Sequence, residues 1–265
     1  MNLFALTNIL IELRLRRGLS VILGDVGTGK TTLSRKLIQE LKDRDDFVFQ
    51  IMLDPSFEND NLFLTALAKN FDINSPFQET DGVPPTPYLR AAIERFLFQK
   101  GVTENKVVVL IIDESQKLSD TSLEVLRVLL NYETNEFKLL QLVLLGQMEL
   151  HAKIIEIANF FDRISFKYTL NPLGMKETRE MIDFRVRQAG YRASMNLFLD
   201  DAIEEIHRHS KGYPRRITML CHKALKNMVL KNKFVVDGAL VDNIVEEEIR
   251  SGWHRSEPLL QKNNC

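Results

Sequence analysis

The chain has 265 residues, enough for one large domain or two smaller ones that each bury a core. Its 35 basic and 36 acidic residues give a formal net charge of -1, which argues against a dedicated polyanion-binding protein but leaves room for a local basic patch. No apolar run approaches the roughly 20 residues that cross a bilayer, and the N-terminus lacks a signal-peptide pattern. The two cysteines, Cys221 and Cys265, lack metal-ligand spacing, so we expect a reduced, cytoplasmic protein.

The first part of the chain alternates short β-rich apolar runs with helical patterns. Strands are predicted over residues 20–23, 47–53, 106–112, 140–145 and 164–168. Helices are predicted over residues 4–17, 30–42, 59–70, 87–99, 120–131 and 149–159. Such alternation predicts a five-stranded parallel sheet covered by helices on both faces, an αβα sandwich. The unbroken apolar run "VVVLII" from Val107 indicates a central strand that is buried on both sides.

Two changes of composition divide the chain. The proline-rich stretch over residues 73–87 predicts a surface loop. Beyond residue 170 only helical patterns follow, over residues 176–189, 199–210, 214–230 and 237–250. We therefore expect an α/β domain (residues 1–170), a small helical domain (171–250) and a frayed tail (251–265).

Glycines are concentrated between the first predicted strand and its helix. Gly24, Gly29, Lys30 and Thr31 spell G-x-x-x-x-G-K-T in the strand-to-helix context that a phosphate-binding loop requires. Glycines let backbone N–H groups face phosphate oxygens, and the helix adds the positive end of its dipole. A glycine-rich turn with a chance lysine is the alternative. The predicted nucleotide-binding residues are Gly24, Asp25, Val26, Gly27, Thr28, Gly29, Lys30, Thr31 and Thr32.

Lys30 is predicted to reach the β- and γ-phosphates of the nucleotide, and Thr31 to ligate Mg²⁺. The stretch "VVVLIIDES" supplies two carboxylates at the end of the buried strand. There Asp113 could hold Mg²⁺ through water, and Glu114 could polarise the attacking water. The alternative is that both carboxylates are merely solvated at a strand terminus. Carboxylates are costly to bury without a cation or donors, so the pair favours a nearby metal and water.

Three more polar residues stand at the ends of predicted elements. Gln147 follows a strand and could orient the water or touch the γ-phosphate, or it could be a capping or turn residue. Arg163 immediately precedes the last strand and could equally be a solvated surface arginine. Arg215 begins a helix of the second domain, from which it could swing toward a phosphate held by the first domain.

Five motifs in this order resemble the AAA+ ATPase domain of the general secretion pathway protein A family, and more distantly the ATPases that regulate transposases. They are "GDVGTGKTTL", "VVVLIIDESQKLS", "LQLVLLGQMEL", "FFDRISFKYTLNPL" and "KGYPRRITMLCHKAL". The resemblance covers about residues 19–249. It implies a P-loop NTPase (AAA+) fold with a five-stranded parallel sheet and a helical lid, which binds ATP and Mg²⁺.

The resemblance also implies roles for individual residues. The Walker A motif corresponds to residues 24–31, and the Walker B motif to Asp113 and Glu114. Gln147 matches sensor 1, Arg163 the arginine finger that acts on a neighbouring subunit, and Arg215 sensor 2. Glu114, Gln147, Arg163 and Arg215 are thus the predicted catalytic residues, and a homo-oligomer, such as a ring or a nucleotide-dependent assembly, is expected.

Two functional classes share these features. One is an oligomeric ATPase that drives assembly of an envelope secretion or pilus machine, with a protein partner there and a position at the inner-membrane surface. The other is a DNA-associated, ATP-dependent regulator of transposition. Net charge near zero and the nearer resemblance favour the first. A nucleotide-dependent interaction module with little turnover is a third class, against which Glu114 argues.

Two further patterns favour surface roles. His207 and His209 are two residues apart on a predicted helix, so their side chains should point in different directions rather than form a metal site. The basic stretch "KALKNMVLKNK" is more typical of a solvated helix face than of a DNA or anionic-lipid patch.

Overall fold

The computed structural model describes residues 3–73, 84–157 and 159–252. Most of the predicted loop over residues 73–87 and of the predicted tail over residues 251–265 lies outside these ranges. The chain divides into two compact units, Met1–Asn171 and Pro172–Cys265, here called the N-terminal and C-terminal units.

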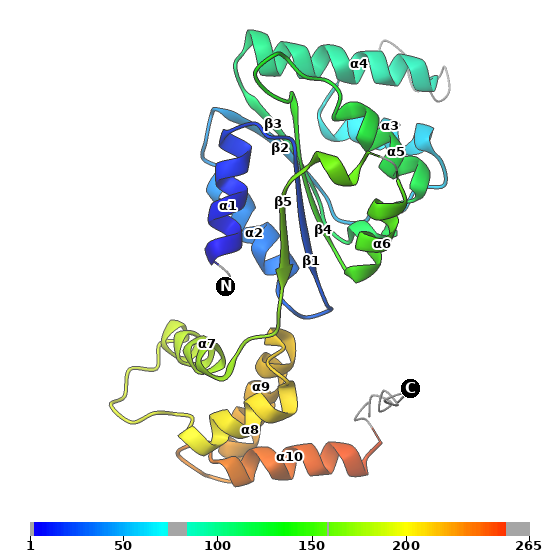
Figure 1. Ribbon diagram of the computed structural model, residues 1–265. Coiled ribbons are helices and arrows are strands. Elements are labelled where there is room, and N and C mark those ends of the chain that lie inside the picture. Colours follow the sequence, from blue (N-terminus) through cyan, green and yellow to red (C-terminus); the bar gives the residue numbers. More distant parts are fainter. Residues whose placement is uncertain (1–2, 74–83, 158, 253–265) are drawn as a thin grey trace. The chain divides into compact units, whose positions relative to one another are not determined.

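The N-terminal unit is built on a five-stranded sheet (Figure 1). Its strands are β1 (Leu19–Gly24), β2 (Phe47–Met52), β3 (Val107–Ile112), β4 (Leu140–Gly146) and β5 (Ile164–Leu170). They lie in the order β2-β3-β4-β1-β5, and every pairing is parallel. The predicted parallel sheet is therefore confirmed.

Helices cover both faces of this sheet (Figure 1). Helices α1 (Leu3–Arg14) and α2 (Lys30–Leu41) pack on one face. The other face carries α3 (Asp60–Asn70), α4 (Thr86–Phe98), α5 (Asp120–Leu129) and α6 (Met148–Glu156). The arrangement is the predicted αβα sandwich.

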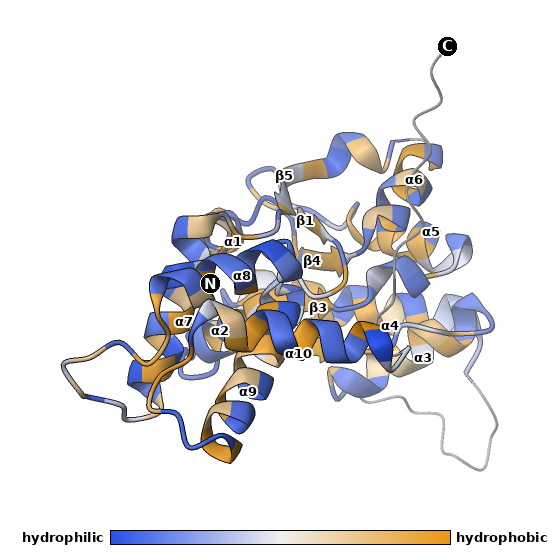
Figure 2. Ribbon diagram, turned by 90° about the horizontal axis from the view of Figure 1, so that it is seen from below, coloured by the Kyte–Doolittle hydropathy of each residue, from blue (hydrophilic) through white to orange (hydrophobic). Residues whose placement is uncertain are grey.

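The β3 strand explains how the sheet joins the two cores. All its residues are buried, and successive side chains of a strand point to opposite faces. Val107, Val109 and Ile111 pack with α1 and α2, whereas Val108 and Leu110 pack with the helices on the other face. The central strand predicted from "VVVLII" is therefore confirmed, and in Figure 2 the inner strands β3 and β4 are drawn in hydrophobic orange.

The predicted element boundaries differ from the observed ones by a few residues, with identifiable causes. The helix predicted over residues 4–17 ends at Arg14, because Arg16 and Gly18 have positive φ angles of 51° and 102°. The helix predicted over residues 149–159 ends at Glu156, ahead of Asn159 at φ 62°. A π-helical turn, Gln99–Thr103, extends α4 and was not predicted.

The C-terminal unit is helical, as predicted from the loss of strand patterns. It consists of α7 (Met175–Gln188), α8 (Asp200–Ser210), α9 (Pro214–Leu230) and α10 (Gly238–Arg250) around a core of its own. Gly212 lies in the turn before α9 at φ 76°, where a Cβ would stand 2.1 Å from the carbonyl oxygen of Leu173. Only glycine fits this close backbone approach.

Candidate functional site

The carboxyl ends of three adjacent strands bring the phosphate loop, Asp113, Glu114 and Gln147 to one edge of the sheet, whereas Arg163 lies elsewhere. β1 ends at Gly24, β3 is followed by Asp113, and β4 is followed by Gln147. Since β4 lies between β3 and β1 and all three run parallel, these positions share one edge. In open parallel sheets this edge is the usual place for a ligand.

The glycine-rich loop joins β1 to α2 at this edge. Gly27 and Gly29 have φ angles of 88° and 107°, a region that side chains other than glycine rarely adopt. Gly24 packs closely, because a Cβ there would lie 2.6 Å from the Thr28 hydroxyl and 3.1 Å from the Leu170 carbonyl oxygen. No side chain caps the start of α2. Its first N–H groups are therefore available to an anion.

Lys30 is buried inside this loop, with 6 % of its surface exposed. Its Nζ donates to the carbonyl oxygens of Gly24 and Asp25, at 2.6 and 3.1 Å. Burial lowers the pKa of Lys30, and the charges of Glu114 and Asp113 oppose that effect. Bonds from an ammonium to phosphate oxygens are stronger than bonds to neutral carbonyls. A polyphosphate in the loop would therefore offer the Lys30 ammonium stronger acceptors than the carbonyl oxygens of Gly24 and Asp25 do.

Asp113 and Glu114 follow β3 beside this loop. Asp113 is 3 % exposed, and its Oδ2 lies 3.5 Å from the Ser34 hydroxyl, one helical turn beyond Lys30. Its Oδ1 accepts the backbone N–H of Glu114 at 2.9 Å. A buried carboxylate with so few donors fits a hydrated divalent cation. Glu114 is half-buried and has a φ angle of 52°, a strained conformation typical of functional positions.

Gln116 connects this segment to Gln147, a link that sequence reasoning missed. Its Nε2 donates to Glu114 Oε2 at 2.8 Å, and its Oε1 accepts the backbone N–H of Gln147 at 3.1 Å. Gln147 precedes α6 as its N-cap residue, but its side chain makes no capping hydrogen bond. The capping alternative considered for this side chain is therefore not supported. No spacing rule marks Gln116, because its partners come from separate strand ends.

Arg163 lies at the other end of the sheet. It directly precedes Ile164, which pairs with Leu19 at the start of β1, whereas Gly24 at the end of β1 pairs with Leu170. The length of a strand therefore separates Arg163 from the phosphate loop of its own chain.

The surroundings of the Arg163 side chain explain its half-buried state. Its Nε is buried and has no hydrogen-bond partner in the described parts of the chain. The pKa of Glu124 on α5 is lowered, chiefly by the hydrogen bond from Arg127 and to a smaller extent by the charge of Arg163. Arg163 thus lies near α5 and differs from the fully solvated arginine that was the alternative reading.

The C-terminal unit contains the remaining predicted site residue. Arg215 is exposed in the first turn of α9. His207 and His209 on α8 have different partners, since His207 Nδ1 lies 3.0 Å from the Thr178 hydroxyl and His209 Nε2 lies 2.9 Å from Asp242 Oδ1. The expectation that these two histidines diverge is confirmed.

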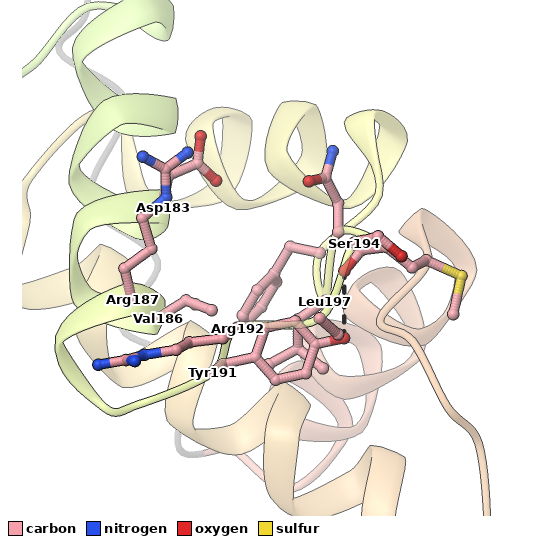
Figure 3. Close-up of a pocket in the computed structure, with 11 residues that line it drawn as sticks. Asp183, Val186, Arg187, Tyr191, Arg192, Ser194 and Leu197 are labelled. Carbon is pink, nitrogen blue, oxygen red and sulfur yellow. Dashed lines mark hydrogen bonds between the residues drawn. The ribbon is translucent and has the colours of Figure 1, made fainter.

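A cavity of about 440 Å³ also lies in the C-terminal unit, where α7 ends and the segment leading to α8 begins (Figure 3). Tyr191 lines it and donates from its hydroxyl to the carbonyl oxygen of Met195 at 3.1 Å. Asp183, Arg187 and Arg192 add charged groups at its edge. None of the predicted site residues lines this cavity.

In the described part of the chain, no helix has the length and apolar character needed to span a membrane.

The sequence of this chain matches a family model and a named relative. A family model described as an AAA domain matches residues 13–154. General secretion pathway protein A of Aeromonas hydrophila is 34 % identical over 210 residues, which make up 78 % of this chain and 36 % of that protein. The chain therefore spans about a third of the length of this relative.

Solved structures match at lower identity. The ORC2 protein of Aeropyrum pernix, in ADPNP-ADP complexes, has a TM-score of 0.65 at 17 % identity, over 92 % of this chain and 66 % of its own. Cdc6p from Pyrobaculum aerophilum has a TM-score of 0.64 at 16 % identity, over 87 % and 62 %. The RuvB Holliday junction branch migration motor of Thermotoga maritima has a TM-score of 0.60 at 16 % identity, over 93 % and 69 %. At such identities the likeness concerns the fold alone.

Proposed function

The chain belongs to the AAA domain family and is a nucleotide-binding ATPase, and on that premise we propose that it hydrolyses Mg-ATP at an interface between subunits to drive assembly of a secretion or pilus-type envelope machine. The observation that carries the proposal is the convergence of Lys30, Asp113 and Glu114 at one sheet edge, with the lysine resting on its own loop. The resemblance to general secretion pathway protein A supports the biological process.

The phosphate loop supplies binding. Backbone N–H groups over residues 24–32, including Val26 and Thr32, surround the phosphates, and the Lys30 ammonium moves from the Gly24 and Asp25 carbonyls to the β- and γ-phosphate oxygens. Thr31 and Asp113 hold Mg²⁺, which neutralises phosphate charge when it is bound. The loop glycines support this assignment, because their positive φ angles shape a backbone cradle.

The chemistry is assigned to residues around the γ-phosphate. Glu114 accepts a proton from the attacking water, and Gln147 orients that water or contacts the γ-phosphate. Arg215, in the predicted helical lid over residues 171–250, is assigned the γ-phosphate contact that its match to sensor 2 implies. Arg163 acts on the nucleotide of a neighbouring subunit, since a strand length separates it from its own phosphate loop. The enzyme is therefore active as a homo-oligomer.

The setting proposed for this ATPase is the cytoplasm, at the inner-membrane face of the machine that it helps to assemble. A DNA-associated regulator of transposition would share the same ATP chemistry. The formal net charge of -1 supports the secretion role over that one. A salt-dependent titration with duplex DNA, with and without ATP, separates the two. Specific, ATP-dependent DNA binding would favour the transposition role.

Calorimetric titration with Mg-ATP tests the binding site itself. Lys30→Ala removes a charge-assisted contact and should weaken ATP binding by about ten- to a hundredfold. Lys36→Ala is the matched control, because Lys36 lies on the same helix but forms an exposed pair with Glu40, and it should bind ATP like the wild type. Equal ATP affinity in the wild type and Lys30→Ala would overturn the assignment.

A further inference from the structure

The Gln116 side chain is hydrogen-bonded both to Glu114, the base assigned above, and to Gln147, the residue assigned as sensor 1. It lies in a short 3-10 turn, Ser115–Lys117, and is half-buried. Its amide makes one hydrogen bond in each direction, to the Glu114 carboxylate at 2.8 Å and from the Gln147 backbone N–H at 3.1 Å.

The chemistry of these two partners fixes how the amide must face. An ionised carboxylate only accepts hydrogen bonds, and a backbone N–H only donates them. A flipped amide would turn its oxygen toward the Glu114 carboxylate and its NH₂ toward the Gln147 N–H, so both bonds would be lost. Glutamine therefore meets a requirement here that an isosteric glutamate or methionine cannot meet in full.

The turn that carries Gln116 is itself anchored. The Lys153 ammonium on α6 donates to the carbonyl oxygens of Gln116 and Leu118, each at 2.8 Å. The Ser115 hydroxyl donates to the Ile112 carbonyl oxygen at 2.8 Å. Because the backbone at Gln116 is anchored to α6, its side chain holds Glu114 at a set distance from the start of α6.

We propose that Gln116 is a positioning residue, which holds the Glu114 carboxylate in its place and ties it to the start of α6 at Gln147. The inference rests on the proposed role of Glu114. A shift of Gln147 when it contacts the γ-phosphate would then move the Glu114 carboxylate through the Gln116 side chain. Such positioning acts on the hydrolysis step and leaves ground-state ATP binding unchanged.

Two substitutions remove one or both of the hydrogen bonds that the Gln116 side chain makes to Glu114 and Gln147. Gln116→Glu keeps an oxygen for the Gln147 N–H but loses the donor to Glu114. Gln116→Met keeps the approximate volume and loses both bonds. Each should lower kcat by about tenfold, the effect of one hydrogen bond to a charged group, while the ATP dissociation constant stays within about twofold. Single-turnover hydrolysis and calorimetric binding measure the two quantities.

Gln99→Glu is the matched control. Gln99 also donates from Nε2 to a glutamate, Glu104, but on the exposed π-helical turn after α4. This variant should hydrolyse ATP like the wild type. Thermal melting of all variants shows whether a lost activity follows from lost folding.

A double mutant shows whether Gln116 acts through Glu114. Adding Gln116→Met to Glu114→Gln should lower the residual rate no further, because the group that Gln116 positions is already gone. A further tenfold loss in that background, or unchanged or faster hydrolysis in both single variants, would overturn the inference while the base assignment stands. Wild-type activity in Glu114→Gln alone would instead overturn the base assignment, and with it the role of Gln116.

Discussion

The two ends of the sheet in the N-terminal unit differ in whether their buried polar groups find partners within the same chain. At the carboxyl end, Lys30 and Asp113 are buried within the phosphate loop and its neighbours, and Glu114 is held by Gln116. At the amino end, Arg163 has a buried Nε without a hydrogen-bond partner among the described residues. The first end contains the groups proposed above for binding and water activation, whereas the second presents a cation that lies a strand length from the phosphate loop of its own chain.

This difference indicates how work is divided between binding and catalysis. Polar groups that are buried together stabilise one another and can form a binding site within a single chain. A guanidinium at the far end of the sheet can act on a phosphate only if another copy brings its own loop there. The comparison therefore predicts that nucleotide binding depends on one subunit and that hydrolysis depends on two.

Removing the far-end cation should have the largest effect. Arg163→Ala should bind ATP normally but hydrolyse it about 10³- to 10⁵-fold more slowly, the range for arginine fingers in other nucleotide hydrolases. Arg127→Ala is the control, since Arg127 also lies beside Glu124 but pairs with it on the surface. Steady-state phosphate release measures both. Comparable rates in the two variants would contradict the finger assignment.

Removing Glu114, the proposed base at the carboxyl end of the sheet, should have the next largest effect. Glu114→Gln keeps the shape of the side chain but cannot accept the proton, so turnover should fall by about two to four orders of magnitude while ATP still binds. Glu40→Gln, on the exposed face of α2, should leave turnover unchanged. Near wild-type hydrolysis by Glu114→Gln would show that another group activates the water.

A change in the shape of the phosphate loop should have a smaller effect. Gly24→Ala places a methyl group 2.6 Å from the Thr28 hydroxyl and 3.1 Å from the Leu170 carbonyl oxygen. Such overpacking should lower the free energy of unfolding by about 1–3 kcal/mol. Gly174→Ala, where the nearest heavy atom would be 3.8 Å away, should be nearly neutral. Chemical denaturation compares them, and equal stabilities would argue against the close packing at Gly24.

The smallest effect is expected from the helical unit. Arg215 is exposed on α9, so Arg215→Ala should leave the fold intact. It should reduce the preference for ATP over ADP by several fold, because the contact proposed for Arg215 is with the γ-phosphate, which ADP lacks. Binding constants for both nucleotides test this expectation. An unchanged preference would remove Arg215 from the site.

The sequence predicted most of the fold because its patterns are strong and local. Apolar runs such as the one from Val107 identified the buried strands, and the loop motif located the first strand-to-helix turn. The π-helical turn at Gln99–Thr103 was missed, since no local signal separates it from the end of an ordinary helix. Gln116 was missed for another reason. Its two partners meet only when β3 and β4 pair in the sheet.

The most direct test of a site shared between subunits is to mix two inactive variants. Arg163→Ala keeps Glu114, and Glu114→Gln keeps Arg163, so a mixed assembly contains interfaces with both intact groups. The account predicts that ATP hydrolysis returns in part on mixing and rises with total protein concentration, because assembly does. A mixture as inactive as its components, under conditions in which the subunits demonstrably exchange, would contradict the account.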